Sequence, residues 1–314
     1  MQFNRIALAA LTMMIAGPAC AQDGEMADVE IRTEQLAPGV AVLFGRGGNI
    51  GVSYGEDGTV LIDDQFAPLT GRIQSAIAGL GADPVRFLIN THWHGDHTGG
   101  NENFGEAGAV IMAHENVRVR MAANGRDGRV VPQAALPVVT YHDGVKLHLN
   151  GDTVHAIHLH NGHTDGDSVI WWENANVAHM GDLYFNRISL PYIDRDSGGS
   201  AQGMAAAIDR VLAITDDETR IIPGHGPMAT RADLIGYRNM LLTINEQVQA
   251  AIDAGNSLEE IQAMNIAAPY EVEGGFISAE QYIGFVHDSL TDPNAMAHDH
   301  ADHGPDHDDG DDHH

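Results

Sequence analysis

The stretch Thr91–His97, THWHGDH, places three histidines and one aspartate directly after the apolar run VRFLIN. Residues two apart on an extended segment face the same side, so His92 and His94 can present their imidazoles to one point. The following glycine lets the chain turn, and Asp96 and His97 then project from the first turn of the next segment. The two pairs of side chains are therefore directed at neighbouring points. This spacing favours two adjacent metal ions over one.

The sequence around this motif alternates strand-like and helix-like segments. Between residues 40 and 64, the runs VAVLFG, IGVSYG and TVLIDD read as antiparallel strands joined by hairpins, before a helix over 67–81 and a strand over 85–90. The second half repeats this order, with strands in KLHLN, DTVHAIHLH, SVIWWE, NVAHMGD and TRIIPGHG, a helix in SAQGMAAAIDRVLAIT and a long amphipathic helix over 231–255. Two such halves predict a layered α/β sandwich, because each sheet must be covered by helices.

The N-terminus has the pattern of a secretory signal peptide. One early arginine precedes an apolar run, and a small-residue site predicts cleavage after Ala21, so that residues 1–21 are removed. A lipoprotein that keeps Cys20 is the alternative. Cys20 is the only cysteine, so the mature chain is expected to hold metals through His, Asp and Glu alone. We expect a periplasmic or secreted protein with no membrane attachment after cleavage.

After the predicted signal peptide, the 314-residue sequence divides into one expected globular domain over 22–292 and a tail over 293–314. From His298 onward the tail is almost entirely His, Asp and Gly, so it cannot bury a core and is predicted to be disordered. It could bind extra metal ions, or it could be a solubilising acidic tail. The net charge of −28 disfavours nucleic-acid binding, because an acidic protein repels phosphate backbones.

Two metal ions need more ligands than the opening motif supplies. Three downstream segments offer them: NGHTDGD contains His163, HMGD contains Asp182, and PGHG contains His225. Each of these residues follows a predicted strand and lies beside glycine, where the backbone can turn tightly and the side chain can reach a shared edge of the sheets.

The ordered set His-x-His-x-Asp-His, Gly-His-Thr, Gly-Asp and Pro-Gly-His-Gly resembles the metallo-β-lactamase superfamily of hydrolases, over about residues 40–242. The resemblance implies a four-layer αββα sandwich with two zinc ions at one edge of the sheets. It implies that the first zinc is held by His92, His94 and His163, the second by Asp96, His97 and His225, and that Asp182 bridges the two.

The resemblance also implies metal-assisted hydrolysis, in which an activated water attacks a carbonyl and Asp96 helps to orient it. The best-known carbapenemases of the family have a cysteine at the position of Asp182 and often a lysine three residues later, where this chain has Phe185. An aspartate bridge is the pattern of glyoxalase II-like thioesterases, lactonases and many periplasmic lactamase-like hydrolases. The substrate is therefore left open.

The segment that follows the bridging aspartate is the candidate for substrate contacts, and we expect Arg187 to replace the missing lysine as a contact for an anion. The alternative is a surface loop that packs its aromatic residues inward. The hairpin GRGGN over 45–49 corresponds to the flap that lactamases fold over substrate, but it is short and has no large apolar tip. The candidate contacts are Tyr184, Phe185, Asn186, Arg187 and Tyr192.

Several other polar residues have simpler interpretations. His158 and His160 also form a His-x-His pair, but the family motif assigns the ligand to His163. Asp63 and Asp64 end a predicted strand and either support the metal ligands or are ordinary turn carboxylates. The remaining histidines are expected to be strand, surface or packing residues: His114, His142, His148, His155, His179 and His287.

Together these features predict a periplasmic two-zinc hydrolase of a small molecule that contains an amide, ester or thioester. β-Lactams are the first choice, because a secreted enzyme of this family meets them in its compartment. A lactonase or thioesterase is the alternative within enzymes, and a periplasmic zinc-buffering protein is the alternative outside them. A diiron oxygenase is disfavoured by His94, where that branch usually has an acid.

Overall fold

The computed structural model describes residues 26–123 and 130–292. The predicted signal peptide and the His/Asp-rich tail lie outside the described residues. Two sheets form the centre: a seven-stranded sheet in the order β1-β2-β3-β4-β5-β6-β7, and a six-stranded sheet in the order β13-β12-β11-β10-β9-β8.

The first sheet is antiparallel from β1 to β4 and parallel from β4 to β7. Its strands are β1 (Arg32–Ala37), β2 (Val40–Phe44), β3 (Ile50–Ser53), β4 (Thr59–Ile62), β5 (Val85–Ile89), β6 (Val110–His114) and β7 (Val139–Tyr141). The helical segments between them are η1 (Ala67–Leu69), α2 (Thr70–Gly79), α3 (Gly95–Thr98), α4 (Asn101–Glu106), α5 (Glu115–Ala122) and η2 (Gln133–Ala135).

The second sheet is antiparallel except for the parallel pair β11 and β12. Its strands are β8 (Gly144–Leu149), β9 (Asp152–His158), β10 (Ser168–Trp172), β11 (Val177–His179), β12 (Arg220–Ile222) and β13 (Ala229–Thr230). Its helical segments are η3 (Gly181–Leu183), η4 (Arg195–Ser197), α6 (Ala201–Leu212), α7 (Arg231–Asp253), α8 (Leu258–Ala263), η5 (Ala268–Tyr270) and α9 (Ala279–Thr291).

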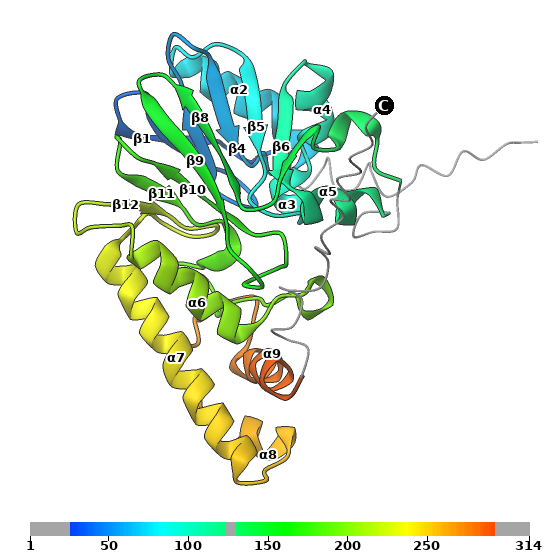
Figure 1. Cartoon of the computed structure of the whole chain (residues 1–314), viewed down its shortest axis with the longest axis vertical. Coiled ribbons are helices and arrows are strands. Elements are labelled where there is room, and N and C mark those ends of the chain that lie inside the picture. The colour runs from blue at the N-terminus through cyan, green and yellow to red at the C-terminus, as the bar shows by residue number, and fades with distance from the viewer. Residues whose placement is uncertain (1–25, 124–129, 293–314) are drawn as a thin grey trace, which may run out of the picture.

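Strand alternation divides the apolar residues among three layers of core, since successive side chains point to opposite faces of a sheet. In β2, Leu43 packs with residues of α2, whereas Val42 packs between the sheets with Trp172 of β10. In β10, Val169 faces the cluster that includes α6, α7 and α9. Figure 1 shows the two sheets between α2, α4 and α5 on one side and α6, α7 and α9 on the other. The predicted αββα sandwich is confirmed.

The predicted helix over 67–81 is a short 3-10 turn followed by α2, and the helix over 231–255 is α7. A capping box fixes the start of α7: the Thr230 side chain accepts from the Asp233 N–H, and the Asp233 carboxylate accepts from the Thr230 N–H. The sequence patterns did not single out β6 or β7, which extend the first sheet. In residues 26–123 and 130–292, no helix is long and apolar enough to cross a membrane.

The strand order brings distant motifs to one edge of the sandwich. The opening motif follows β5, the segment with Asp182 follows β11, and the segment with His225 follows β12. His163 lies in the loop between β9 and β10, next to the end of β11, because β10 and β11 are antiparallel. Four segments far apart in sequence therefore meet where their strands end.

Candidate metal centre

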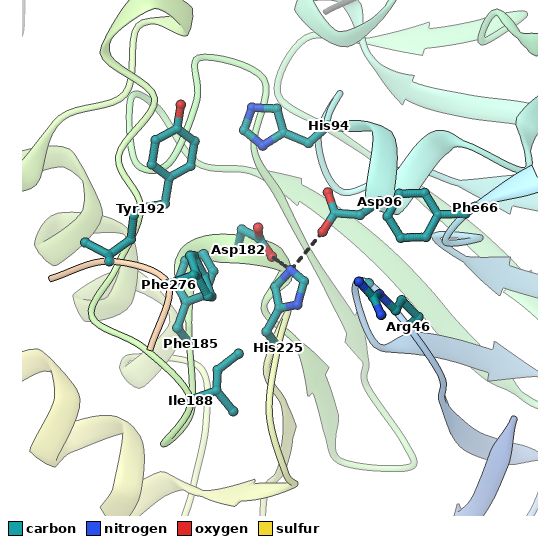
Figure 2. Close-up of a pocket in the computed structure, with 12 residues that line it drawn as sticks. Arg46, Phe66, His94, Asp96, Asp182, Phe185, Ile188, Tyr192, His225 and Phe276 are labelled. Carbon is teal, nitrogen blue, oxygen red and sulfur yellow. Dashed lines mark ion pairs between the residues drawn. The ribbon is translucent and has the colours of Figure 1, made fainter. Parts of the chain in front are cut away.

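The structure brings the seven predicted ligands together in two adjoining groups. His92, His94, His163 and Asp182 form one group, and Asp96, His97 and His225 form the other, with the candidate ligand atoms of each group within 4.8 Å of one another. Figure 2 shows Asp182 and Asp96 converging on His225.

Asp182 faces both groups, one oxygen to each. Its Oδ2 lies 3.7 Å from His92 Nε2 and 3.6 Å from His163 Nε2, whereas its Oδ1 lies 3.1 Å from His97 Nε2 and 3.2 Å from His225 Nε2. A carboxylate placed in this way can bind two cations at once. This is the arrangement expected of a bridging ligand.

The local backbone explains how the opening motif serves both groups. His94 has an extended backbone as the N-cap of α3, and Asp96 and His97 lie in the single turn that follows. Two glycines admit the ligands: a Cβ on Gly48 would lie 2.2 Å from the His97 ring, and one on Gly224 would lie 2.2 Å from Asp182 Oδ1. Any side chain at either glycine would displace a candidate ligand.

Each imidazole of the first group is held by a polar atom behind it. Asp194 Oδ2 lies 2.7 Å from His94 Nε2, so His94 turns its Nδ1 inward, 2.8 Å from His163 Nε2. His163 Nδ1 lies 2.8 Å from the Tyr192 carbonyl, and His92 Nδ1 lies 3.0 Å from Thr91 Oγ1. Such partners fix the orientation of a ligating ring and the nitrogen that it offers.

The second group has a similar support in Asp63, which the sequence left undecided. Its Oδ2 lies 2.7 Å from His97 Nδ1 and accepts from Thr91 Oγ1 at 2.8 Å, while its Oδ1 accepts from the Thr91 N–H at 2.8 Å. Asp63 is fully buried and has a φ of 61° at the end of β4. This strained position is consistent with a supporting role rather than that of an ordinary turn carboxylate.

Sequence reasoning missed Asp194, the support of His94. Its Oδ2 also accepts from Ser197 Oγ at 2.8 Å, and Ser197 Oγ accepts from Trp93 Nε1 at 3.2 Å. Burial raises the pKa of Asp194, but the hydrogen bonds from His94 and Ser197 outweigh it and lower that pKa to about 2. Asp194 follows the candidate substrate contacts in the sequence, and this position was the only sequence feature that could have pointed to its role.

Burial and neighbouring charges shift the pKa values of the histidines in the two groups in opposite directions. Burial lowers the pKa of His92 well below its usual range and that of His163 to about 4, so both offer neutral imidazoles. Burial also opposes charge on His225, but the carboxylates of Asp182 and Asp96 outweigh it and raise its pKa to about 9. Burial would raise the pKa of Asp182, yet the surrounding histidines hold it well below its usual range. The carboxylates around the second group therefore stabilise a positive charge at the position of His225.

The residues present fit two zinc ions. His92 Nε2 is buried and has no hydrogen-bond partner in the described part of the chain, a costly arrangement that a bound cation would relieve. The donors are five imidazoles and two carboxylates, a set that suits zinc.

A pocket of about 510 Å³ opens onto these groups. Of the predicted substrate contacts, Phe185 and Tyr192 line it. The hairpin over 45–49 contributes Arg46 and Gly47, and the structure adds four lining residues that the sequence analysis did not name: Phe66, Ile188, Phe276 and Ile277.

The other three predicted contacts are corrected, because Tyr184, Asn186 and Arg187 line a neighbouring groove against α7, which of the described residues shares only Phe185 with the metal pocket. Tyr184 has an extended backbone, so it points away from the side that Phe185 takes. Its hydroxyl donates to Asn186 Oδ1 at 3.0 Å, and Arg187 donates to Asp233 Oδ1 at 2.8 Å. Arg187 is therefore not the anion contact in this pocket.

The comparisons with known proteins agree with this geometry. The family model described as "Metallo-beta-lactamase superfamily" matches residues 43–225, more than half of the chain. The chain belongs to this superfamily. It is a member with a metal-dependent hydrolase fold and a candidate metal site at the family's motif positions.

Proteins described with different activities are similar to this chain. A hydroxyacylglutathione hydrolase from Nitrosococcus oceani is 31% identical over 160 residues, which cover 50% of this chain and 55% of that protein. A metallo-beta-lactamase structure from Pontibacter korlensis has a TM-score of 0.58 at 19% identity, covering 68% of this chain and 99% of that one. A sec-alkylsulfatase structure from Pseudomonas sp. has a TM-score of 0.64 at 16% identity, covering 90% of this chain and 54% of that one. The chain thus spans about half the length of the hydroxyacylglutathione hydrolase, and the two structures support the fold alone.

Proposed function

We propose that this chain is a two-zinc hydrolase that opens the carbonyl of an amide, ester or thioester, with β-lactams as the first substrates to test. The observation that carries the proposal is the position of Asp182. Its two oxygens face the two histidine groups, and it also lines the pocket.

The proposed ligands are those of the two groups, with Asp182 shared between the ions. When bound, zinc would lower the pKa of a water and polarise the substrate carbonyl. The protein holds the ligand rings in place through Asp63, Asp194 and the Tyr192 carbonyl.

Asp96 lines the pocket and is suited to orient an attacking water. Burial opposes its charge, but His97 and His225 outweigh that effect and lower its pKa to about 2. It therefore stays a carboxylate that accepts a hydrogen bond. Among the described lining residues there is no serine, threonine or cysteine, so a covalent intermediate on such a side chain has no support.

A thioesterase or lactonase is the second candidate. The similarity to a hydroxyacylglutathione hydrolase favours it, as does the aspartate at position 182. The pocket walls do not decide between these carbonyl compounds, because aromatic and aliphatic side chains accept the apolar part of either.

The proposed location is the periplasm or the exterior of the cell, on the strength of the N-terminal sequence pattern. The tail is proposed to bind additional metal ions through its histidines and aspartates. Truncation at Met296, followed by zinc titration, tests the second proposal: an unchanged stoichiometry together with unchanged activity at limiting zinc would reject it.

The decisive experiment measures metal content and turnover in the same purified protein. We expect about two tightly bound zinc ions per chain and chelator-sensitive hydrolysis of nitrocefin, an acyl lactone or a thioester, restored by zinc. An alkyl sulfate belongs in the panel because one structural neighbour is described as an alkylsulfatase. Tight zinc without turnover of any carbonyl substrate would contradict the proposal and favour a zinc-buffering protein.

A further inference from the structure

The mouth of the metal pocket has an apolar wall that includes an exposed aromatic side chain. Phe276 is 54% exposed, yet its ring lies 5.6 Å from that of Phe185, and Phe185 stacks on the candidate ligand His225 at 5.5 Å. Figure 2 shows Phe276, Phe185 and Tyr192 on the same side of the pocket. An exposed aromatic ring beside a pocket is a surface that an apolar ligand can cover.

The backbone holds Phe276 in this position. The Ile277 N–H donates to Ser189 Oγ at 3.0 Å, and the Gly275 N–H donates to the Val272 carbonyl at 2.9 Å. A Cβ on Gly275 would lie 3.2 Å from Ser189 Cα, so the two segments are in close contact. The segment before α9 is therefore fixed against the segment that follows Asp182, and it presents Phe276 at the mouth.

Arg46 lies on the opposite side, in the hairpin between β2 and β3. Several other arginines are paired with a carboxylate, as Arg120 is with Asp165 and Arg238 is with Asp209. For Arg46, no hydrogen bond or ion pair is found with any residue in ranges 26–123 and 130–292. Figure 2 shows Arg46 on the side of the pocket opposite Phe276, Phe185 and Tyr192.

The Arg46 hairpin is anchored to the metal site. The Asn49 side chain donates to the Pro223 carbonyl at 2.8 Å and to the Gly226 carbonyl at 2.9 Å, on either side of His225. The Gly48 N–H donates to the Asp96 carbonyl at 3.1 Å. The backbone that carries Arg46 thus keeps a fixed position relative to the candidate ligands.

We infer that the substrates of this enzyme carry a carboxylate that pairs with Arg46 and an apolar group that lies against Phe276 and Phe185. The inference rests on the proposed hydrolase function and specifies its substrate class: amphipathic carbonyl compounds with an anionic group and an apolar group. In a chain with a net charge of −28, Arg46 adds a local positive charge at the mouth, beside the proposed zinc ions, that favours the approach of such an anion.

The test separates ligand binding from turnover. Isothermal titration calorimetry on the zinc-loaded protein compares 4-phenylbutyrate with the neutral 4-phenylbutanol. For Arg46→Gln, we expect about fivefold weaker binding of the carboxylate, the upper range for an exposed ion pair, and no change for the alcohol. Arg46→Lys should recover most of the loss at low salt, because it keeps the charge.

Phe276→Ala tests the apolar wall. We expect it to weaken both ligands about fivefold through lost aromatic contact, and to leave binding of acetate unchanged. Arg210→Gln is the matched control: Arg210 is an exposed arginine on α6, and its loss should change neither ligand.

The outcomes distinguish the inference from the function on which it rests. Equal binding of the carboxylate by the native protein and Arg46→Gln would show that the carboxylate binds the metals alone, and would overturn the inference. Suppose that Arg46→Gln weakens the carboxylate alone and Phe276→Ala weakens both ligands, but no carbonyl substrate is turned over. The roles of Arg46 and Phe276 in ligand binding would then be supported, and the proposed hydrolase function would be overturned. The same variants, assayed on any hydrolysed substrate, should raise KM and leave kcat nearly unchanged.

Discussion

Within residues 26–123 and 130–292, histidines pack together in the candidate metal centre and in a second cluster of His114, His142, His158 and His160. Of these two, the metal centre alone has convergent ligand atoms. In the candidate metal centre, neighbouring rings such as those of His92 and His97 lie 4.2 Å apart and their nitrogens converge on Asp182. In the second cluster, His114 and His158 stack face to face at 3.7 Å, with an angle of 8° between the rings. Similar residues at similar distances therefore form two different structures.

The difference lies in what holds the rings from behind. In the metal centre, carboxylates such as Asp63 and Asp194 turn one nitrogen outward and leave the other facing inward. In the second cluster, His158 Nδ1 donates to the Asp167 carbonyl at 2.8 Å, and His114 Nδ1 accepts from the Asn116 N–H at 3.3 Å to cap α5. A metal site is defined by convergent nitrogens and a shared carboxylate, and the number of histidines does not predict it.

Removal of the shared carboxylate should have the largest effect. We expect Asp182→Asn to lower kcat/KM by about 10³-fold or more, because the bridge positions both ions and their loss removes several kcal/mol of transition-state stabilisation. Metal content should fall below two ions per chain by elemental analysis. Asp143→Asn is the control, since Asp143 lies 3.0 Å from His142 in the second cluster. Two retained ions together with more than a tenth of native activity would contradict the bridging role.

Removal of one supporting carboxylate should have a smaller effect. Asp194→Asn keeps the shape of the side chain but removes the charge behind His94, so we expect zinc affinity to fall about 10-fold to 100-fold. Competition with a chromophoric chelator measures this change. Asp196→Asn, at an exposed position two residues later, should leave zinc affinity unaltered; an equal loss in both variants would show that Asp194 acts only through local stability.

The second cluster should change how the free energy of unfolding depends on pH. Burial lowers the pKa of His114 to about 3, with further lowering by His158, His142 and His160 and an opposing effect of Asp143. In the unfolded chain His114 therefore takes up a proton near pH 6.5, whereas in the folded chain it stays neutral until the pH approaches 3. Stability from this group is complete above pH 6.5 and is lost as the pH falls towards 3, at up to about 1.4 kcal/mol per pH unit.

His114→Asn tests this effect, because asparagine can still cap α5 but does not titrate. Between pH 6.5 and 4.5, we expect the unfolding free energy of the variant to fall less steeply with acidification than that of the native protein, in urea titrations at each pH. Metal release is common to both proteins and cancels in the difference. His148→Asn, at an exposed histidine of β8, should follow the native curve; if His114→Asn does so too, burial of a neutral His114 does not contribute.

The fold and the gathering of the ligands could be predicted because both follow from local patterns. The spacing of His92 and His94 on an extended segment, followed by a turn with Asp96 and His97, is a short-range signal, and the glycines beside the later ligands mark strand ends. Asp194 and Phe276 carry no such signal, and the hairpin pattern over 45–49 did not identify Arg46 itself as a contact. Asp194 reaches His94 across 100 residues, and the position of Phe276 depends on how the segment before α9 packs, which only tertiary structure determines.

The smallest effect on activity is expected at His160, which forms a second His-x-His pair with His158 in the sequence. His160 has its ring against His158 at 4.5 Å in a T-shaped contact, whereas His163 is fully buried beside His94. His160→Gln should therefore keep both tightly bound ions and change kcat/KM by less than about twofold, as expected for a residue that does not touch the reacting groups. His163→Gln should lose the ion of the first group. If elemental analysis after mild chelator treatment shows the loss in His160→Gln instead, the metal centre extends into the second cluster and the distinction between the two fails.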